Sequence, residues 1–229
     1  MKNQIKEKAR AAGKHFGISA IIITLSLILI KKLWYPDQLF YIMSAEKIFF
    51  ILAATDIIIG PTLTFIIYKK EKNSLRKDLT AIALIQTTAL ALGIKTLAEA
   101  RPVWIVYNYG VFDIVRANEV SLENTSNHTP LPKNAWTGPK LVAARLPQSN
   151  SDRTKILFDT LSGKPDISKN PKYFIPIESA WKEIKTTAIP KKILNIENTY
   201  SLPVTGSAIP SVAIIYKTQY PKLRIIKAP

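Results

Sequence analysis

The sequence predicts a membrane protein in which three N-terminal transmembrane α-helices precede a small α+β, mainly β, domain. Long apolar runs occur before residue 100, whereas the remainder is polar and holds most of the 15 prolines. The near-neutral mean hydropathy of +0.08 therefore averages two unlike regions. The expected division is a basic tail over 1–16, a three-helix region over 17–100 and an α+β domain over 101–229.

The first apolar run extends from Gly17 to Leu33. A cleaved signal peptide would need small residues just past this run, but Lys31, Lys32 and the aromatic pair Trp34-Tyr35 occupy that place. Lysine and aromatic side chains are typical anchors at a membrane interface. We therefore expect an uncleaved span.

Two further runs are each about twenty residues long, which is enough to cross a hydrocarbon core of ~30 Å at 1.5 Å per residue. The three spans are expected at about 17–35, 48–68 and 79–98.

Basic residues in the short flanking segments predict the orientation, because cytoplasmic loops carry an excess of lysine and arginine. Two clusters of five flank the spans, namely Lys2, Lys6, Lys8, Arg10 and Lys14 in the tail, and Lys69, Lys70, Lys72, Arg76 and Lys77 between spans two and three. The N terminus is then cytoplasmic. Three crossings of a bacterial inner membrane place the domain after Arg101 in the periplasm.

The formal charge of +16 first suggests a nucleic-acid partner, but the distribution argues against it. Residues 1–100 carry +7 and residues 101–229 carry +9, and ten of the fourteen basic residues in the first part are those two clusters. That pattern is typical of membrane topology. The basic excess of the later domain indicates a solvated surface, with anionic lipid or an acidic protein as the sharper alternative.

The chain has few side chains suited to binding a metal or to thiol chemistry. There is no cysteine, and the two histidines, His15 and His128, lie far apart and outside any ligand-spaced motif. We expect both to be solvated or interfacial side chains and expect no cofactor.

Asp56 lies near the middle of the second span and is followed by Gly60-Pro61 and Thr64. A charged carboxylate at that depth costs ~2.5–3.5 kcal/mol on insertion scales, so it should face other helices or be protonated. Proline removes a backbone donor and favours a kink. Two interpretations stay open: a packing kink with an interhelical hydrogen bond, or a site that binds a partner.

Span three contributes Gln86, an expected interhelical donor, and Lys95 near its outer end. The Lys95 ammonium can snorkel to the interface. Asp56 differs from Lys95 in depth by roughly 7–8 Å, so a direct ion pair is not implied.

After Arg101-Pro102, β-branched and aromatic residues at 103–107 and 111–116 flank a turn at Asn108–Gly110 and predict a hairpin. Residues 121–140 are expected to form a loop. Short helices are expected at 151–161 and 176–186, prolines interrupt the chain after them, and strands are expected at 211–216 and 222–226.

Enzymatic activity is not expected. No nucleophile elbow, glycine-rich phosphate loop or carboxylate pair in an apolar setting is present in the sequence. No small-molecule substrate is expected either.

Several short segments occur in order over roughly residues 5–120, namely Lys32–Pro36 with Leu39-Phe40, Asp56 with Gly60–Thr64, Lys77–Leu79, Gln86, Arg101–Val103 and Phe112–Glu119. Taken together, these segments resemble the type IV pilin accessory proteins of the TfpX/TfpZ family. Residues 57–59 and 65–68 include more β-branched side chains than we expect at these positions in that family. After about residue 120 no motif carries over, so specificity for a partner could lie there.

The resemblance implies an inner-membrane accessory protein or chaperone that stabilises a cognate type IV pilin and supports pilus assembly. Its partners would be that pilin and inner-membrane lipids. A stored pilin is an apolar helix with one acidic residue near its outer end, and spans two and three offer Gln86, Thr88 and Lys95 to it. Candidate partner-binding or intramembrane polar residues are Asp56, Gly60, Pro61, Thr64, Gln86, Lys95 and Arg101. The alternative is a membrane-embedded sensor or transport-associated subunit in which Asp56 is an ion or proton site.

Overall fold

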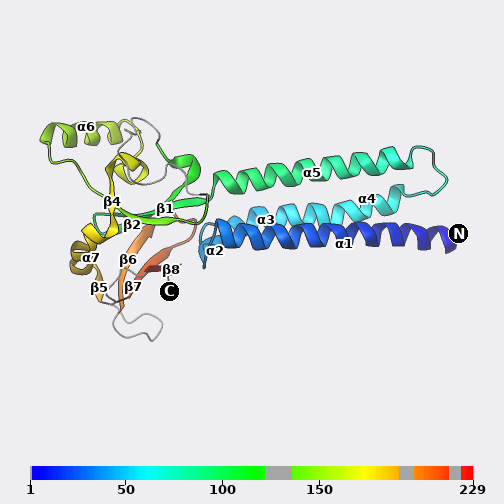
Figure 1. Cartoon of the computed structure of the whole chain (residues 1–229), viewed down its shortest axis with the longest axis horizontal. Helices are drawn as coiled ribbons and strands as arrows, with labels where there is room; N and C mark the ends of the chain where they lie inside the picture. Colours follow the sequence, from blue (N-terminus) through cyan, green and yellow to red (C-terminus); the bar gives the residue numbers. More distant parts are fainter. Residues whose placement is uncertain (1, 122–135, 191–198, 217–222, 229) are drawn as a thin grey trace. The chain divides into compact units, whose positions relative to one another are not determined.

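The computed structural model describes residues 2–121, 136–190, 199–216 and 223–228 (Figure 1). The chain forms two compact units. The helical unit comprises Met1–Lys32 and Ala45–Ala98, and the sheet domain comprises Leu33–Ser44 and Glu99–Pro229. The sheet domain is therefore assembled from two separate stretches of sequence.

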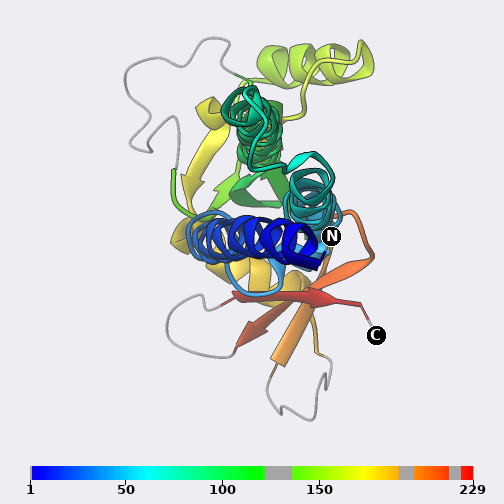
Figure 2. The same ribbon diagram turned by 90° about the vertical axis from the view of Figure 1, so that its right-hand side faces the viewer.

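Three helices long and apolar enough to cross a membrane make up the helical unit: α1 (Lys2–Leu33), a second helix over Ala45–Ile67, and α5 (Leu75–Glu99). The second helix consists of α3 (Ala45–Ala54), a π-helical turn (Thr55–Ile59) and α4 (Gly60–Ile67). The three helices alternate in direction, and Figure 2 views them nearly end-on. The three predicted spans fall on these helices, although residues 34–35 and 68 lie beyond the helix ends, and α1 also includes the basic tail.

Few side chains are buried between the helices, because three helices leave most of their surface facing outward. The buried apolar residues are Ile23, Ile30, Ala45, Phe49, Ile82 and Leu97. Large aliphatic side chains such as Ile21, Leu25 and Ile85 are exposed on the outer surface. An outer surface of this composition suits a lipid environment rather than water.

The sheet domain is built around an eight-stranded mixed sheet. Its strands are β1 (Pro102–Asn108), β2 (Val111–Arg116), β3 (Lys140–Ala144), β4 (Phe174–Pro176), β5 (Ile189–Pro190), β6 (Thr199–Thr205), β7 (Ser211–Tyr216) and β8 (Leu223–Lys227). The order is β4-β3-β1-β2-β6-β7-β8, with β5 paired to β6. The β1–β3 and β2–β6 pairs are parallel, and the other pairs are antiparallel.

The residues between the first two long helices belong to the core of this domain. Tyr35 is 1% exposed and Phe40 is 3% exposed, with their ring centroids 6.0 Å apart. Helix α2 (Leu39–Ile42) contacts β8, and the Ala208 amide donates to the Ile42 carbonyl oxygen. Tyr35, expected to be an interfacial anchor, is therefore a core residue of the sheet domain.

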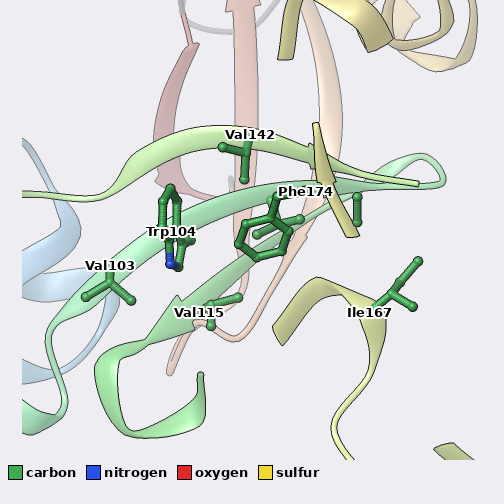
Figure 3. Packing of buried hydrophobic residues seen from close by; sticks show 8 residues of the cluster. Val103, Trp104, Val115, Val142, Ile167 and Phe174 are labelled. Atoms are coloured by element: carbon green, nitrogen blue, oxygen red, sulfur yellow. The ribbon is translucent and has the colours of Figure 1, made fainter. Parts of the chain in front are cut away.

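Strand β1 is buried on both faces. On one face, Trp104 packs edge-on against Phe174, with ring centroids 5.3 Å apart, and Val115, Val142 and Ile167 surround the pair (Figure 3). Large aromatic side chains contribute most of the apolar area in such a cluster.

Several predicted elements are confirmed. The hairpin is the antiparallel β1–β2 pair, the first short helix is α6 (Asn150–Leu161), and the last two strands are β7 and β8. The second short helix is a 3₁₀ turn followed by α7 (Trp181–Thr187). Residues 122–135 of the expected loop lie outside the described part of the chain.

Strands β3 to β6 were missed, so the small α+β domain was an incomplete description of a unit dominated by its sheet. A proline is the reason why β6 was not predicted. Pro203 lies inside that strand and pairs with Val212 on one side only. On the other side the β5 pairing reaches Ser201 and the β2 pairing begins at Val204, so no ladder bond is needed at Pro203.

Candidate functional site

Asp56 lies in the π-helical turn of the second helix and is 6% exposed. Pro61 explains the turn, because a proline cannot donate to the carbonyl four residues earlier and the helix must adjust around it. Single π turns inside α-helices are frequent at functional sites. The turn directs the Asp56 carboxylate into the helical unit.

Gln86 of α5 is the side chain that meets this turn. Its Nε2 donates to Asp56 Oδ1 at 3.4 Å and lies 3.5 Å from the main-chain oxygens of Thr55 and Asp56. Both side chains are buried, with Gln86 8% exposed. A Cβ at Gly60 would overlap the Gln86 amide, so the absence of a side chain at Gly60 allows the two helices to approach.

A second polar contact lies one turn further along α4. Thr64 Oγ1 is 2.7 Å from His15 Nδ1 of α1, and Thr64 is buried. Ser19, one turn after His15, is buried as well. His15, expected to be solvated or interfacial, is half-buried and takes part in the contacts between helices. The four-residue spacing of His15 and Ser19 was the available sequence signal.

Lys95 lies apart from this polar group. It follows Gln86 by nine residues, about two and a half helical turns, and its side chain is exposed on α5. Thr88, seven residues before Lys95, is exposed on the same face of α5. The structure thus brings together Asp56, Gly60 and Gln86, with Thr64 nearby, and leaves Lys95 on an outer surface.

Arg101 belongs to the sheet domain, where three of the segments that carried the resemblance meet. Its carbonyl oxygen accepts from the Ala117 amide, and Pro102 pairs with Arg116 across β1 and β2. The Arg101 guanidinium lies over the Trp136 ring at 5.1 Å. Burial raises the pKa of Tyr35 to about 12, and the positive charges of Arg116 and Arg101 act in the opposite direction.

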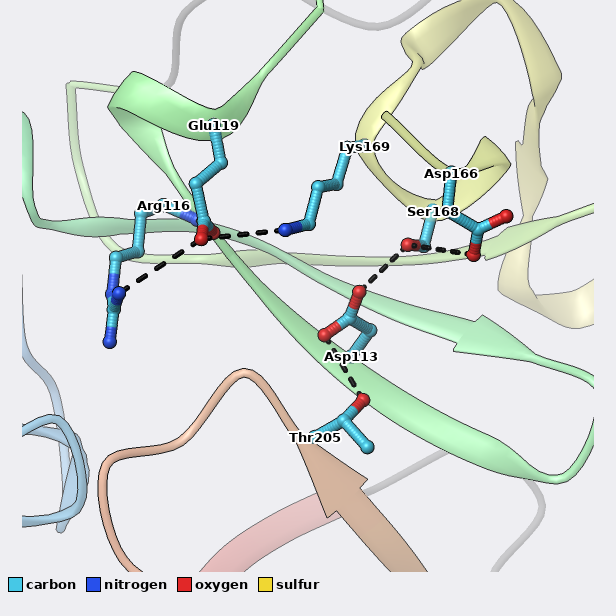
Figure 4. A network of polar contacts seen from close by, with 7 residues as sticks. All are labelled: Asp113, Arg116, Glu119, Asp166, Ser168, Lys169 and Thr205. Carbon is cyan, nitrogen blue, oxygen red and sulfur yellow. Dashed lines mark hydrogen bonds and ion pairs between the residues drawn. The ribbon is translucent and has the colours of Figure 1, made fainter. Parts of the chain in front are cut away.

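Side chains of the segment Phe112–Glu119 hydrogen-bond to neighbouring parts of the sheet domain (Figure 4). Asp113 Oδ2 accepts from Ser168 Oγ at 2.7 Å, and Asp113 Oδ1 accepts from Thr205 Oγ1 at 3.1 Å. Glu119 accepts from the Arg116 amide at 3.0 Å and from Lys169 Nζ at 3.4 Å. Alternate residues of β2, Phe112 and Ile114, are buried. This segment therefore ties β2 to β6 and to the 3₁₀ turn Ile167–Lys169.

The chemistry of these groups is hydrogen bonding and charge pairing. Across the described residues, no group of three or more His, Asp and Glu side chains is placed to hold a metal ion. The expected lack of a cofactor and of catalysis stays a prediction.

Known proteins similar to this chain are fimbrial assembly proteins of Dichelobacter nodosus. Those of serogroups E1 and I are each 25% identical over 224 residues, covering 87% of this chain and 86% of their own length. The protein of serogroups C1 and C2 is 32% identical over 118 residues, which span 50% of this chain and 89% of that relative. This chain belongs to the fimbrial assembly protein family. Membership in the TfpX/TfpZ branch stays a prediction.

No protein-family model and no solved structure matches this member of the fimbrial assembly family. The alignment with the serogroup E1 and I proteins extends over most of the chain, so the similarity is not confined to the apolar helices.

Proposed function

We propose that this protein is a non-enzymatic inner-membrane accessory protein that stabilises a cognate type IV pilin before or during pilus assembly. The observation that carries the proposal is the similarity to fimbrial assembly proteins over most of the chain. The three long apolar helices and the polar residues within them support it.

The proposed topology has a cytoplasmic N terminus and a periplasmic sheet domain. Ten basic residues against three acidic ones lie in the tail and in the 69–78 connection, which favours a cytoplasmic position for both. Residues 33–44 and 99–229 form one domain, so both must lie on the same side of a membrane crossed by the three helices. The two crossings made between these segments, by the second helix and by α5, meet that condition.

The proposed contact for the pilin helix is the outward face of α5. Leu84 is 63% exposed and Leu92 is 60% exposed, and Thr88 and Lys95 are exposed at compatible helical spacings. Lys95 lies four residues before the end of α5. An acidic residue near the outer end of a pilin helix would meet the ammonium at a similar depth. Ionisable side chains within a membrane commonly pair with one another, which lowers the cost of holding each charge in lipid.

A deletion strain tests the function. Removing the gene should lower the amount of cognate pilin and of surface pili while the pilin transcript stays constant, because a chaperone acts on a subunit already made. Pilin and pili at wild-type amounts in that strain would refute the proposal.

Substitutions at Lys95 test the contact. Lys95→Leu should reduce pilin co-purification while the accessory protein keeps its normal amount, and Lys95→Arg should preserve co-purification. Lys47→Leu removes an exposed cation near the same end of another helix and serves as the matched control. Equal co-purification with Lys95→Leu and Lys47→Leu would exclude the ion pair and leave Lys95 as a snorkelling anchor.

A further inference from the structure

A basic cavity opens between α1, α4 and α5 at the end of the helical unit where α4 ends and α5 begins. Its volume is about 620 Å³, within the range of roughly 300–1,000 Å³ usual for small-molecule sites. The polar residues that line it include Glu7, Arg10, Lys14, His15 and Lys70, and the apolar ones include Ile18 and Leu79. The polar part of the lining thus carries three cations against one carboxylate, and the other part is aliphatic.

Two of these cations come from one face of α1. Arg10, Lys14 and Ile18 are spaced four residues apart, so they follow one another along the same side of the helix. Arg10 and Lys14 make no ion pair with any residue in the described ranges, whereas Lys70 pairs with Glu7 at 3.6 Å. Two positive charges therefore border the cavity without a protein counter-ion from the described part of the chain.

His15 and Thr64, whose side chains are in contact at 2.7 Å, both line the cavity, and Thr64 is buried. Ile18 follows Lys14 by one turn of α1. Together with Leu79 and Ala83 of α5 it forms the apolar part of the lining. A ligand that fills both regions must be anionic at one end and hydrocarbon at the other.

We propose that this cavity binds the head group of one anionic phospholipid. Arg10 and Lys14 would contact the phosphodiester, and an acyl chain would follow Ile18 and Leu79 into the bilayer. Basic pockets between membrane helices on the cytoplasmic side recognise anionic lipid head groups in this way. The inference uses the proposed membrane placement and is independent of the pilin contact, which was assigned to another face of α5.

The test compares full-length protein in nanodiscs of phosphatidylcholine with and without phosphatidylglycerol, and counts retained lipids by native mass spectrometry. The wild-type protein should retain one phosphatidylglycerol in preference to phosphatidylcholine. The variant with Arg10→Gln and Lys14→Gln should bind it roughly ten- to thirtyfold more weakly, the scale expected for two lost head-group contacts.

The matched control carries Lys2→Gln and Lys6→Gln, which remove the same charge from the same tail but from positions outside the cavity lining. It should retain the lipid like the wild type. Equal loss in both variants would show diffuse attraction to the tail and overturn the proposal. Displacement of the lipid by excess inorganic phosphate would overturn it too, because it would identify a small-anion site. Circular dichroism of each variant checks that the helices are intact. A further variant, Ile18→Asn, alters only the aliphatic part of the lining and should also weaken retention of the lipid.

Discussion

Gly206 follows strand β6 with a φ of +74° and lies directly against β2. A Cβ at this position would overlap the main-chain oxygen of Ile114 and come within 2.9 Å of Asp113 Oδ1. A main-chain oxygen in the middle of a paired strand cannot move aside. Both the backbone conformation and the space therefore require glycine, next to the carboxylate that joins β2 to Thr205.

We expect Gly206→Ala to lower the free energy of unfolding of the sheet domain by roughly 2–4 kcal/mol, since backbone strain and overlap add. All four tryptophans, Trp34, Trp104, Trp136 and Trp181, lie in this domain, so fluorescence of the full-length protein during denaturant unfolding reports on it. Gly163→Ala is the matched control, because Gly163 has a φ of +87° and a methyl group added there would meet no atom within 4 Å. That variant should lose only about 1 kcal/mol, and equal losses would contradict the steric argument.

Ionisation of Tyr35 should make the stability of the sheet domain depend on pH. Burial raises its pKa from 10.0 to about 12, so between these values the tyrosine ionises in the unfolded chain while it stays protonated in the folded domain. The unfolded state then binds fewer protons, and stability falls as the pH rises through this window. The contribution is complete below about pH 10 and amounts to roughly 2–3 kcal/mol.

The difference between the wild type and Tyr35→Phe isolates this contribution, because the other titrating groups are common to both. The wild type should lose stability faster than Tyr35→Phe between about pH 10 and 12 when tryptophan fluorescence follows unfolding. Parallel curves would show that the Tyr35 hydroxyl is not buried in solution.

At the level of elements, the second long helix combines a π turn, a proline and a buried carboxylate within a few residues. Each feature is unfavourable in an apolar helix when taken singly. Together they place Asp56 opposite Gln86, whose amide nitrogen lies within hydrogen-bonding distance of the carboxylate and of the main-chain oxygens of the turn. This contact joins the second helix to α5.

Substitution of Asp56 should separate hydrogen bonding from charge. Asp56→Asn should keep nearly normal protein and pilin amounts, because an amide can still accept from Gln86. Asp56→Leu should reduce the amount of membrane-inserted protein, since it leaves the buried Gln86 amide with fewer acceptors. Adding Gln86→Leu to Asp56→Leu should restore part of that loss, because two apolar groups are better tolerated than one unsatisfied polar group. Immunoblots of membrane fractions measure this, and a silent Asp56→Leu would show that the contact is dispensable.

The sequence predicted the helical part more fully than the sheet, for a physical reason. The length and apolarity that a span needs are local properties, so the three runs can be read directly. Strand pairing is not local, since β1 pairs with β3 across the whole 121–140 segment. The proline at position 203 also made β6 look like an interrupted stretch of chain. The polar residues Asp56 and Gln86 could be selected individually, but their contact depends on the packing of two helices that the pattern does not specify.

The whole molecule joins a helical unit to a domain made of two separated segments. This arrangement makes the topology testable by chemical labelling, because the chain has no cysteine and each introduced thiol reports alone. Tyr41 and Gln148 are exposed in the two segments of the sheet domain, and Asn73 is exposed in the connection between the second helix and α5.

In intact cells, a maleimide that does not cross the inner membrane should label Tyr41→Cys and Gln148→Cys but not Asn73→Cys. Asn73→Cys should react once the inner membrane is permeabilised, which is the control for thiol reactivity. Labelling of Asn73→Cys alone in intact cells would reverse the orientation. Different results for Tyr41→Cys and Gln148→Cys would contradict the single domain itself.

The inclusion of residues 33–44 in the sheet domain also sets an order on biosynthesis. These residues leave the ribosome early, yet α2 packs against β8 and bonds to Ala208, which are among the last parts of the chain to be made. Tyr35, Leu39 and Phe40 therefore lack their final contacts while two further long helices, the helices α6 and α7, and seven strands are synthesised. Contacts so distant in sequence form slowly. A chain that stops short of β8 would keep this apolar segment uncovered, which gives cellular proteases a direct way to distinguish incomplete copies from finished ones.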